Sequence, residues 1–94
     1  MTINDGFGVA LKRIRQVRNM SQEDFSDVSS RTYISSLERG LKSPTIEKVS
    51  VIAKAMDVDP LTLLMLTYAQ SSDETIESLL QRLTHEFEAL GIDR

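Results

Sequence analysis

The segment from Arg31 to Gly40 carries the side chains best suited to contact the bases and phosphates of a nucleic acid. If the segment is helical, Ile34 and Leu37 share its inner side. The polar side chains then share the outer side: Arg31, Thr32, Ser35, Ser36 and Arg39. A guanidinium can form two hydrogen bonds with guanine, and threonine offers a hydroxyl and a methyl group to a base edge. The pattern therefore predicts a surface that contacts bases and phosphates.

Residues for other kinds of chemistry are scarce. The chain has no cysteine and one histidine, His85, so the sequence offers neither a thiolate site nor a histidine cluster. The carboxylate pairs Glu23–Asp24 and Asp57/Asp59 stand at expected helix starts, where capping accounts for them. No glycine-rich segment has the spacing of a phosphate-binding loop. We therefore expect no enzymatic activity, no cofactor and no metal site.

Charge is distributed unevenly along the chain, whose 94 residues have a net charge of −3. Residues 1–48 contain eight Lys/Arg against six Asp/Glu (+2), whereas residues 49–94 contain three against eight (−5). This asymmetry favours one face for an anionic partner and an acidic remainder, although ordinary solvated helix surfaces would give the same counts. With 40% hydrophobic and 27% charged residues, the composition is that of a globular domain with one modest core.

Apolar residues recur at helical spacing throughout, and no segment alternates as a strand would. Six helices are therefore predicted. Their approximate ranges are Asp5–Arg18, Gln22–Val28, Arg31–Arg39, Ile46–Met56, Pro60–Tyr68 and a last helix that follows Ser72 or Asp73 and reaches Leu90. The predicted fold is all-α, with a five-helix domain in residues 1–69 and an additional C-terminal helix in residues 70–94.

Several helix ends are marked by residues that satisfy free backbone groups. Ser21 and Thr45 can accept hydrogen bonds from the first N–H groups of a helix, as can one serine of the pair Ser29–Ser30. Asp59 stands before a proline, which suits the first position of a helix. Gly40 fits the left-handed residue that closes a helix.

The last two helices carry more apolar residues than a small domain needs. The fifth is apolar nearly all round, and the sixth repeats apolar residues at spacings of 4, 3, 4 and 3, as a coiled-coil seam does. The residues predicted to join two copies are Leu63, Leu66, Ile76, Leu80, Leu83, Phe87 and Leu90. The alternative is that this seam packs on its own domain.

Residues 21–44 contain a motif that is specific as a set. It reads Ser-Gln-Glu-Asp-Phe at 21–25, Arg-Thr-Tyr-Ile-Ser-Ser-Leu-Glu-Arg-Gly at 31–40 and Ser-Pro at 43–44. In these residues the chain resembles the Cro/repressor (XRE) family of helix-turn-helix regulators, and the segment from Arg31 is most similar to the controller proteins of restriction–modification systems. The resemblance extends from Leu11 to Leu64 and implies a five-helix, lambda-repressor-like fold.

The turn before the third helix departs from the family pattern. Ser26 stands where family members usually have alanine, the usual glycine is absent, and the turn is about two residues shorter. A shorter turn forces the second helix to end early or the third to begin differently. It therefore affects the angle at which the third helix is held.

The resemblance implies that the third helix lies in the major groove of double-stranded DNA, with its first residues on base edges. Direct readout is expected chiefly from Arg31, while Gln22 at the start of the second helix is expected on a phosphate. The full predicted DNA-binding set is Gln22, Arg31, Thr32, Tyr33, Ser35, Ser36, Arg39, Lys42 and Ser43. Glu38, a hallmark of the family, is expected to pair with Arg15 and to fix the third helix against the first.

The predicted function is that of a sequence-specific transcription regulator that binds a near-palindromic operator as a homodimer. Two alternatives remain open: an antitoxin whose C-terminal helix binds a toxin, and a protein-interaction module without DNA binding. The longest apolar stretch, Leu61–Leu66, is far shorter than the ~18 residues of a membrane span. No signal peptide is recognisable, so the expected location is the cytoplasm and no membrane partner is expected.

Overall fold

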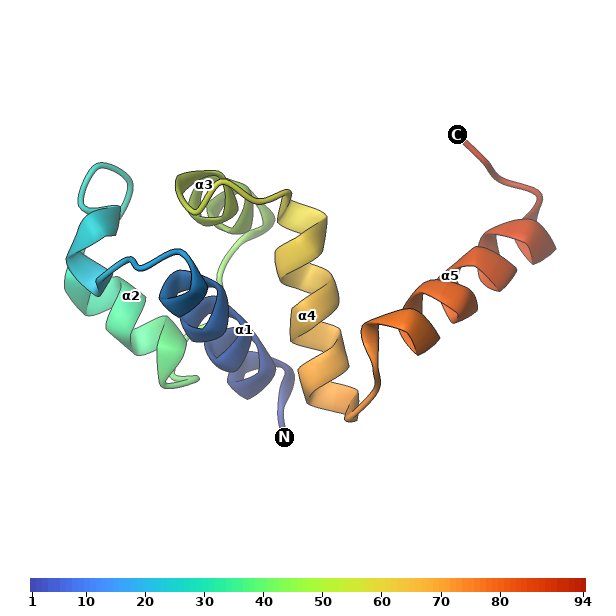
Figure 1. Ribbon diagram of the computed structural model, residues 1–94, viewed down its shortest axis with the longest axis horizontal. Helices are drawn as coiled ribbons and strands as arrows, with labels where there is room; N and C mark the ends of the chain where they lie inside the picture. The colour runs from blue at the N-terminus through green and yellow to red at the C-terminus, as the bar shows by residue number, and fades with distance from the viewer.

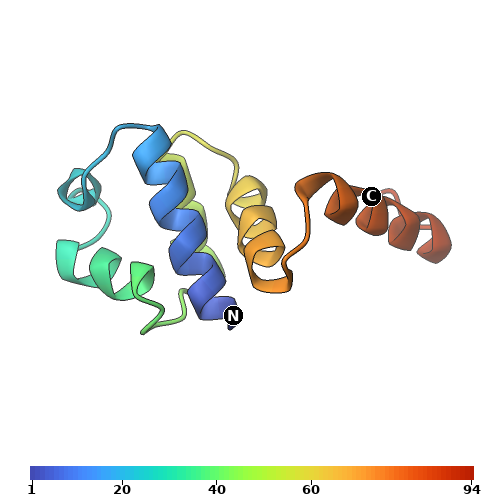
Figure 2. The same cartoon turned by 60° about the horizontal axis from the view of Figure 1, so that its bottom comes forward.

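The computed structural model describes residues 1–94 and contains only helices, turns and loops, which confirms the all-α prediction. Its elements are α1 (Ile3–Val17), the 3₁₀-helix η1 (Gln22–Phe25), α2 (Arg31–Glu38), α3 (Ile46–Ala55), α4 (Pro60–Ser72) and α5 (Ile76–Leu90). Figures 1 and 2 show α1 between α2 and α4, while α5 projects away from the other helices. None of these helices is both long and apolar enough to cross a membrane.

Eleven buried apolar side chains form the core, and they come from every element except α5. They are Phe7, Ala10, Leu11, Phe25, Ile34, Leu37, Val49, Ile52, Ala53, Met56 and Leu63. The prediction that Leu63 contacts a second copy is wrong, because α4 turns this side chain fully into the core. Val17 is exposed in the last turn of α1, so the apolar side of this helix is not buried along its whole length.

Two glycines allow α1 to approach both neighbouring helices closely. A Cβ atom on Gly8 would lie 2.5 Å from the carbonyl oxygen of Glu38 in α2. A Cβ atom on Gly6 would lie 2.7 Å from the carbonyl oxygen of Thr67 in α4. Glycine inside a helix costs roughly 1 kcal/mol relative to alanine. At these two positions that cost is offset by the close packing of α1 against α2 and α4.

The first two helices begin and end differently from the prediction. Thr2 begins α1, because its hydroxyl accepts a hydrogen bond from the Asp5 N–H and the Asp5 carboxylate accepts one from the Thr2 N–H. The α-helix predicted at 22–28 is instead the four-residue η1. The Ser26 N–H donates to the carbonyl of Glu23, three residues earlier, and the chain then turns instead of continuing as an α-helix.

The ends of α2 follow the sequence signals. The Ser30 hydroxyl accepts a hydrogen bond from the Tyr33 N–H at 3.1 Å, so the second serine of the pair is the cap. Gly40 has a φ angle of 74°, which confirms the expected left-handed residue. The helix itself ends at Glu38, with Arg39 as its C-cap.

The junction between α4 and α5 lies further along the chain than predicted. α4 continues beyond the predicted end at Tyr68 to Ser72, and the hydroxyls of Ser71 and Ser72 donate to carbonyls four residues earlier in the same helix. Asp73 then adopts a left-handed conformation and ends α4. Thr75, rather than Ser72 or Asp73, caps α5, since its hydroxyl accepts from the Ser78 N–H.

A cluster of hydrogen bonds around Glu74 fixes this junction. The Glu74 carboxylate accepts from the Arg82 guanidinium at 2.8 Å and from the Ser78 hydroxyl at 3.0 Å. Arg82 first, and Ser78 second, hold the pKa of Glu74 below its ordinary value. The cluster therefore adds stability above the ordinary pKa of a glutamate and loses it as the pH falls through the lowered pKa.

Gly8→Ala should destabilise the chain, although a glycine-to-alanine change within a helix usually stabilises it. The added methyl group meets the backbone of α2, and overpacking of this kind costs about 1–3 kcal/mol. Urea unfolding followed by circular dichroism measures the effect, with Gln16→Ala on the exposed side of α1 as the control. An unchanged free energy of unfolding in Gly8→Ala would contradict the close helix contact.

Candidate nucleic-acid interface

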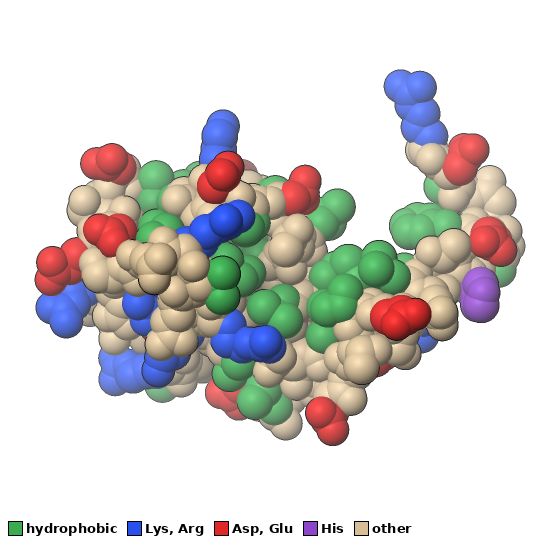
Figure 3. Space-filling model, viewed as in Figure 1, with side chains coloured by type: hydrophobic (Ala, Val, Ile, Leu, Met, Phe, Trp, Pro, Cys, Tyr) green, Lys and Arg blue, Asp and Glu red, His purple; other side chains and the backbone are tan.

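The outer side of α2 is open to solvent. Ile34 and Leu37 are fully buried beneath it, whereas Arg31, Thr32 and Arg39 are exposed, as the helical spacing predicted. Ser35 is half-buried, and Lys42 and Ser43 are exposed in the loop that follows. Figure 3 shows Lys and Arg side chains gathered around the α2 end of the molecule. Most of the predicted DNA-binding residues therefore lie within one region of the surface.

Ser36 does not belong to this exposed surface. Only 7% of Ser36 is accessible to solvent, so the prediction that it approaches DNA is wrong. After the left-handed Gly40, the chain turns back, and the Leu41 N–H donates to the Ser36 carbonyl at 3.0 Å. Helical spacing alone placed Ser36 outward, because spacing takes no account of the segments that pack around the helix.

Tyr33 lies between two lysines at the edge of the exposed surface. The Nζ atoms of Lys42 and Lys48 each lie 5.4 Å from the centre of its ring, within the range of a cation–π contact. The Lys48 ammonium also donates to the carbonyl of Val28 at 2.7 Å, which ties α3 to the turn before α2. The sequence analysis missed Lys48, because nothing in its local pattern distinguishes it from an ordinary surface lysine.

A partly buried ion pair joins α1 to α2. Arg15 donates to the Glu38 carboxylate through Nε at 2.6 Å and through Nη2 at 3.0 Å, so the expected pair is present. The hydrogen bonds to Glu38 raise the pKa of Arg15 above its ordinary value. The Arg15 guanidinium also donates through Nη1 to the carbonyl of Met20, which fixes the linker between α1 and η1.

Gln22 completes this cluster from η1. Its side-chain amide donates to Glu38 Oε1 at 3.1 Å, so the amide expected on a phosphate is engaged inside the protein. Arg18 donates to the carbonyls of Met56 and Asp57 at the end of α3. Both side chains thus hold the scaffold together around the exposed side of α2.

Arg31 has a partner in the free protein. Its Nη1 atom lies 3.4 Å from the carboxylate of Glu23 in η1, and both side chains are largely exposed. The short turn between them is anchored, since the N–H groups of Val28 and Ser29 both donate to the carbonyl of Phe25. The shortened turn therefore has a defined conformation that brings η1 and the start of α2 together.

A helix-turn-helix family model (HTH_3) matches residues 11–63, from the second half of α1 to the first turn of α4. The chain belongs to this family. In this helix-turn-helix protein, η1 and α2 form the two helices of the motif. The chain is also 40% identical over 62 residues to the control protein C.BamHI of Bacillus amyloliquefaciens, an alignment that covers 60% of this chain and 76% of that protein. No solved structure matches the chain significantly.

The family and the geometry agree on the class of partner. The chain is an XRE-type, DNA-binding transcription regulator, similar to a restriction–modification controller, and double-stranded DNA is its partner. In such folds the second helix of the motif is the one that enters the major groove. Here that helix is α2, whose inner side is buried and whose outer side is open.

Glu38→Ala should lower the free energy of unfolding by about 1–3 kcal/mol, because Arg15 would remain charged and partly buried without its carboxylate partner. Urea unfolding measures this loss. Glu23→Ala is the matched control, since its ion pair with Arg31 is largely exposed and should contribute little. Equal losses of stability in the two variants would show that the Arg15–Glu38 pair does not hold the helices together.

Proposed function

We propose that this regulator binds a near-palindromic operator as a homodimer, with α2 of each copy in one of two successive major grooves. The observation that carries the proposal is the open outer side of α2, which presents Arg31 and Thr32 at the start of the helix. Two such helices reach successive grooves when they lie roughly 34 Å apart. Selection of bound sites from random DNA tests the proposal, because it returns the half-site and the spacing together.

Base contacts and phosphate contacts divide between the two ends of α2. Arg31 can form a bidentate contact with guanine, and Thr32 can contact a neighbouring base edge. Arg39, Lys42 and Ser43 lie at the other end, where exposed cationic and hydroxyl groups suit the DNA backbone. This division predicts that Arg31 determines sequence preference, whereas the later residues contribute to binding of any DNA.

The proposed activity is binding without catalysis. Asp24 accepts a hydrogen bond from the Ser21 N–H at 2.7 Å, and Asp59 accepts one from the Leu61 N–H at 2.8 Å. Both carboxylates are therefore used as helix caps. Capping accounts for these acidic residues without a reaction.

An exposed apolar surface where α4 and α5 diverge supports the homodimer. A groove of about 330 Å³ lies there, and most of its lining is apolar. Its apolar lining residues are Leu61, Leu64, Met65, Tyr68, Leu79 and Leu83. Figure 3 shows apolar side chains gathered at this point. An uncovered surface of this kind on a small protein suits a protein–protein contact.

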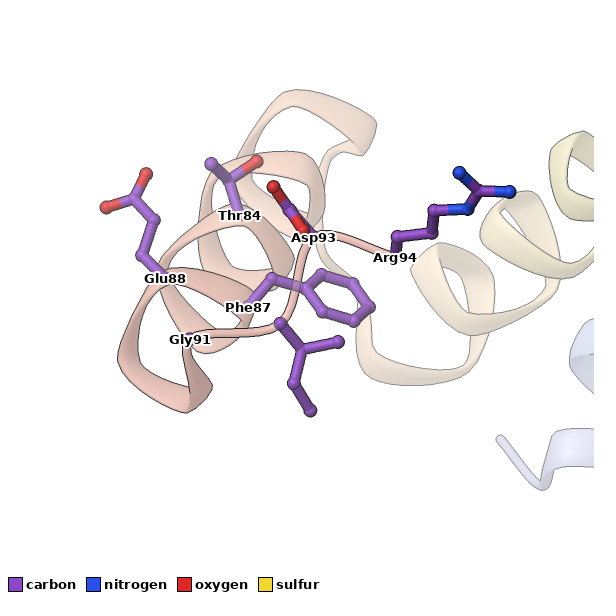
Figure 4. A pocket seen from close by; sticks show the side chains of 7 residues that line it. Thr84, Phe87, Glu88, Gly91, Asp93 and Arg94 are labelled. Carbon is purple, nitrogen blue, oxygen red and sulfur yellow. The ribbon is translucent and has the colours of Figure 1, made fainter.

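The apolar surface continues to the far end of α5. Leu79 is buried against the body, but Leu80, Phe87 and Leu90 are about half to two-thirds exposed. Beyond Gly91 the chain turns back and bounds a shallow hollow beside the Phe87 ring (Figure 4). The seam therefore does not pack on its own domain along most of its length.

The spacing of this seam suits a second copy of the same chain. From Leu80 to Leu90 the apolar residues are separated by 3, 4 and 3 positions, which reads the same in both directions. A two-fold symmetric contact pairs one patch with the same patch of a second copy, so a continuous apolar seam can serve both sides of it. Of the other predicted seam residues, Ile76 is partly exposed, and Leu66 is half-buried beside Ile14 and Val58.

The same exposed surface supports a second candidate, in which α5 binds a different protein, as in an antitoxin. The two candidates differ in what the isolated chain does. A homodimer requires self-association, whereas an antitoxin-like regulator can leave α5 free until its partner is present. A monomer in sedimentation at tens of micromolar would favour the second candidate.

Arg31→Ala should weaken binding to the selected operator by about 1–3 kcal/mol and relax the preference at one base pair. Lys42→Ala is the control, because loss of a phosphate contact should weaken all sequences alike and reduce the salt slope by about one unit. Fluorescence anisotropy on the operator and on single-base variants measures both effects. If Arg31→Ala kept the full site preference, the proposed register of α2 on DNA would be wrong.

Phe87→Glu should raise the dissociation constant of the homodimer at least about tenfold, equivalent to about 1.4 kcal/mol, because a carboxylate would replace an apolar contact. The DNA-binding domain should keep its stability, since α5 contributes nothing to the main core. Sedimentation velocity over a range of concentrations measures the change. His85→Glu, on the polar side of α5, is the control and should leave self-association intact. Equal effects of both variants would contradict the proposal that the apolar side of α5 joins the two copies.

A further inference from the structure

The ion pair between Glu23 and Arg31 connects the two helices of the motif at the surface expected to face DNA. The Oε1 and Nη1 atoms are 3.4 Å apart, with 72% of the Glu23 side chain and 67% of the Arg31 side chain exposed. An exposed pair of this kind contributes little to stability. The position of this ion pair matters, because Arg31, the residue proposed to contact a base, has a carboxylate beside it before DNA binds.

The backbone of η1 holds Glu23 in place from both sides. Before it, the Gln22 amide is bonded to Glu38, and after it the Asp24 carboxylate accepts a hydrogen bond from the Ser21 N–H. Phe25, two residues further, is fully buried. Glu23 is therefore presented to Arg31 by a fixed element, and the short turn between η1 and α2 keeps the two side chains within reach.

A carboxylate beside an arginine affects two kinds of DNA contact differently. A guanidinium that binds a phosphate brings the neighbouring carboxylate close to a second anion, and the two like charges repel each other. The O6 and N7 atoms of guanine are neutral acceptors, so contact with them carries a smaller penalty. The carboxylate thus opposes phosphate contacts more than it opposes base contacts.

We propose that Glu23 is a positioning residue that sharpens the sequence preference of Arg31. It holds the guanidinium at the start of α2 and disfavours its use on the DNA backbone, so that non-specific binding weakens more than operator binding. This role rests on the proposed reading of a base pair by Arg31. In this proposal Glu23 helps the protein to distinguish its operator from other DNA, in addition to placing an acidic residue in the first turn of a helix.

Glu23→Gln tests the proposal, because it removes the charge while keeping the size of the side chain. Affinity is measured on the operator, on the operator altered at the base pair read by Arg31, and on unrelated DNA, at several salt concentrations. Binding to unrelated DNA should tighten about three- to tenfold with a steeper salt dependence, and operator binding should tighten less. Glu77→Gln in α5 is the control for net charge, since it makes the same charge change on a different element.

Combining Glu23→Gln with Arg31→Ala distinguishes an effect of Glu23 through Arg31 from direct repulsion between Glu23 and DNA. In the Arg31→Ala background, Glu23→Gln should have no further effect on discrimination at that base pair. If it still lowered discrimination there, Glu23 would act on DNA directly and the proposal would be overturned. The proposal would also be overturned if Glu23→Gln alone left the ratio of operator affinity to unrelated-DNA affinity unchanged. If Arg31→Ala had no effect on site preference, both the proposed register of α2 and this role of Glu23 would be wrong.

Discussion

The partly buried ion pair between Arg15 and Glu38 is the contact on which the placement of α2 depends. Both side chains are largely removed from water, so each charge requires the other and a full set of hydrogen bonds. Arg15 also bonds the linker at Met20, and Glu38 also bonds Gln22 of η1. Because four segments meet at one pair of charges, a shift of α2 along α1 would leave at least one charge without its partner.

Apolar packing complements this pair but is less specific in direction. The glycines of α1 allow α2 and α4 to lie close to it, and the core residues fill the space between the helices. Apolar contacts tolerate small rotations, whereas a bidentate arginine–carboxylate pair does so poorly. We therefore attribute the depth of packing to the apolar core and the orientation of α2 chiefly to the ion pair.

The sequence predicted those features that depend on local chemistry. Ser30 caps α2, Gly40 is left-handed, and Asp59 begins α4 before a proline, because each signal involves only a few neighbouring residues. The features that failed depend on distant parts of the chain. Ser36 is buried where the chain turns back after α2, and Lys48 reaches the turn from another helix. Spacing along a single helix contains neither piece of information.

The arrangement of the helices lets a regulator use two surfaces at once. α1 separates α2 from α4, and α5 extends from α4 away from α2 in both views (Figures 1 and 2). A partner seated on the exposed seam of α5 would therefore not cover the outer side of α2. Six of the eight acidic residues of 49–94 lie from Asp73 onward, on α5 or at its ends, and α5 projects away from α2. Like charges repel less at greater distance, so this separation leaves the basic surface around α2 available for DNA.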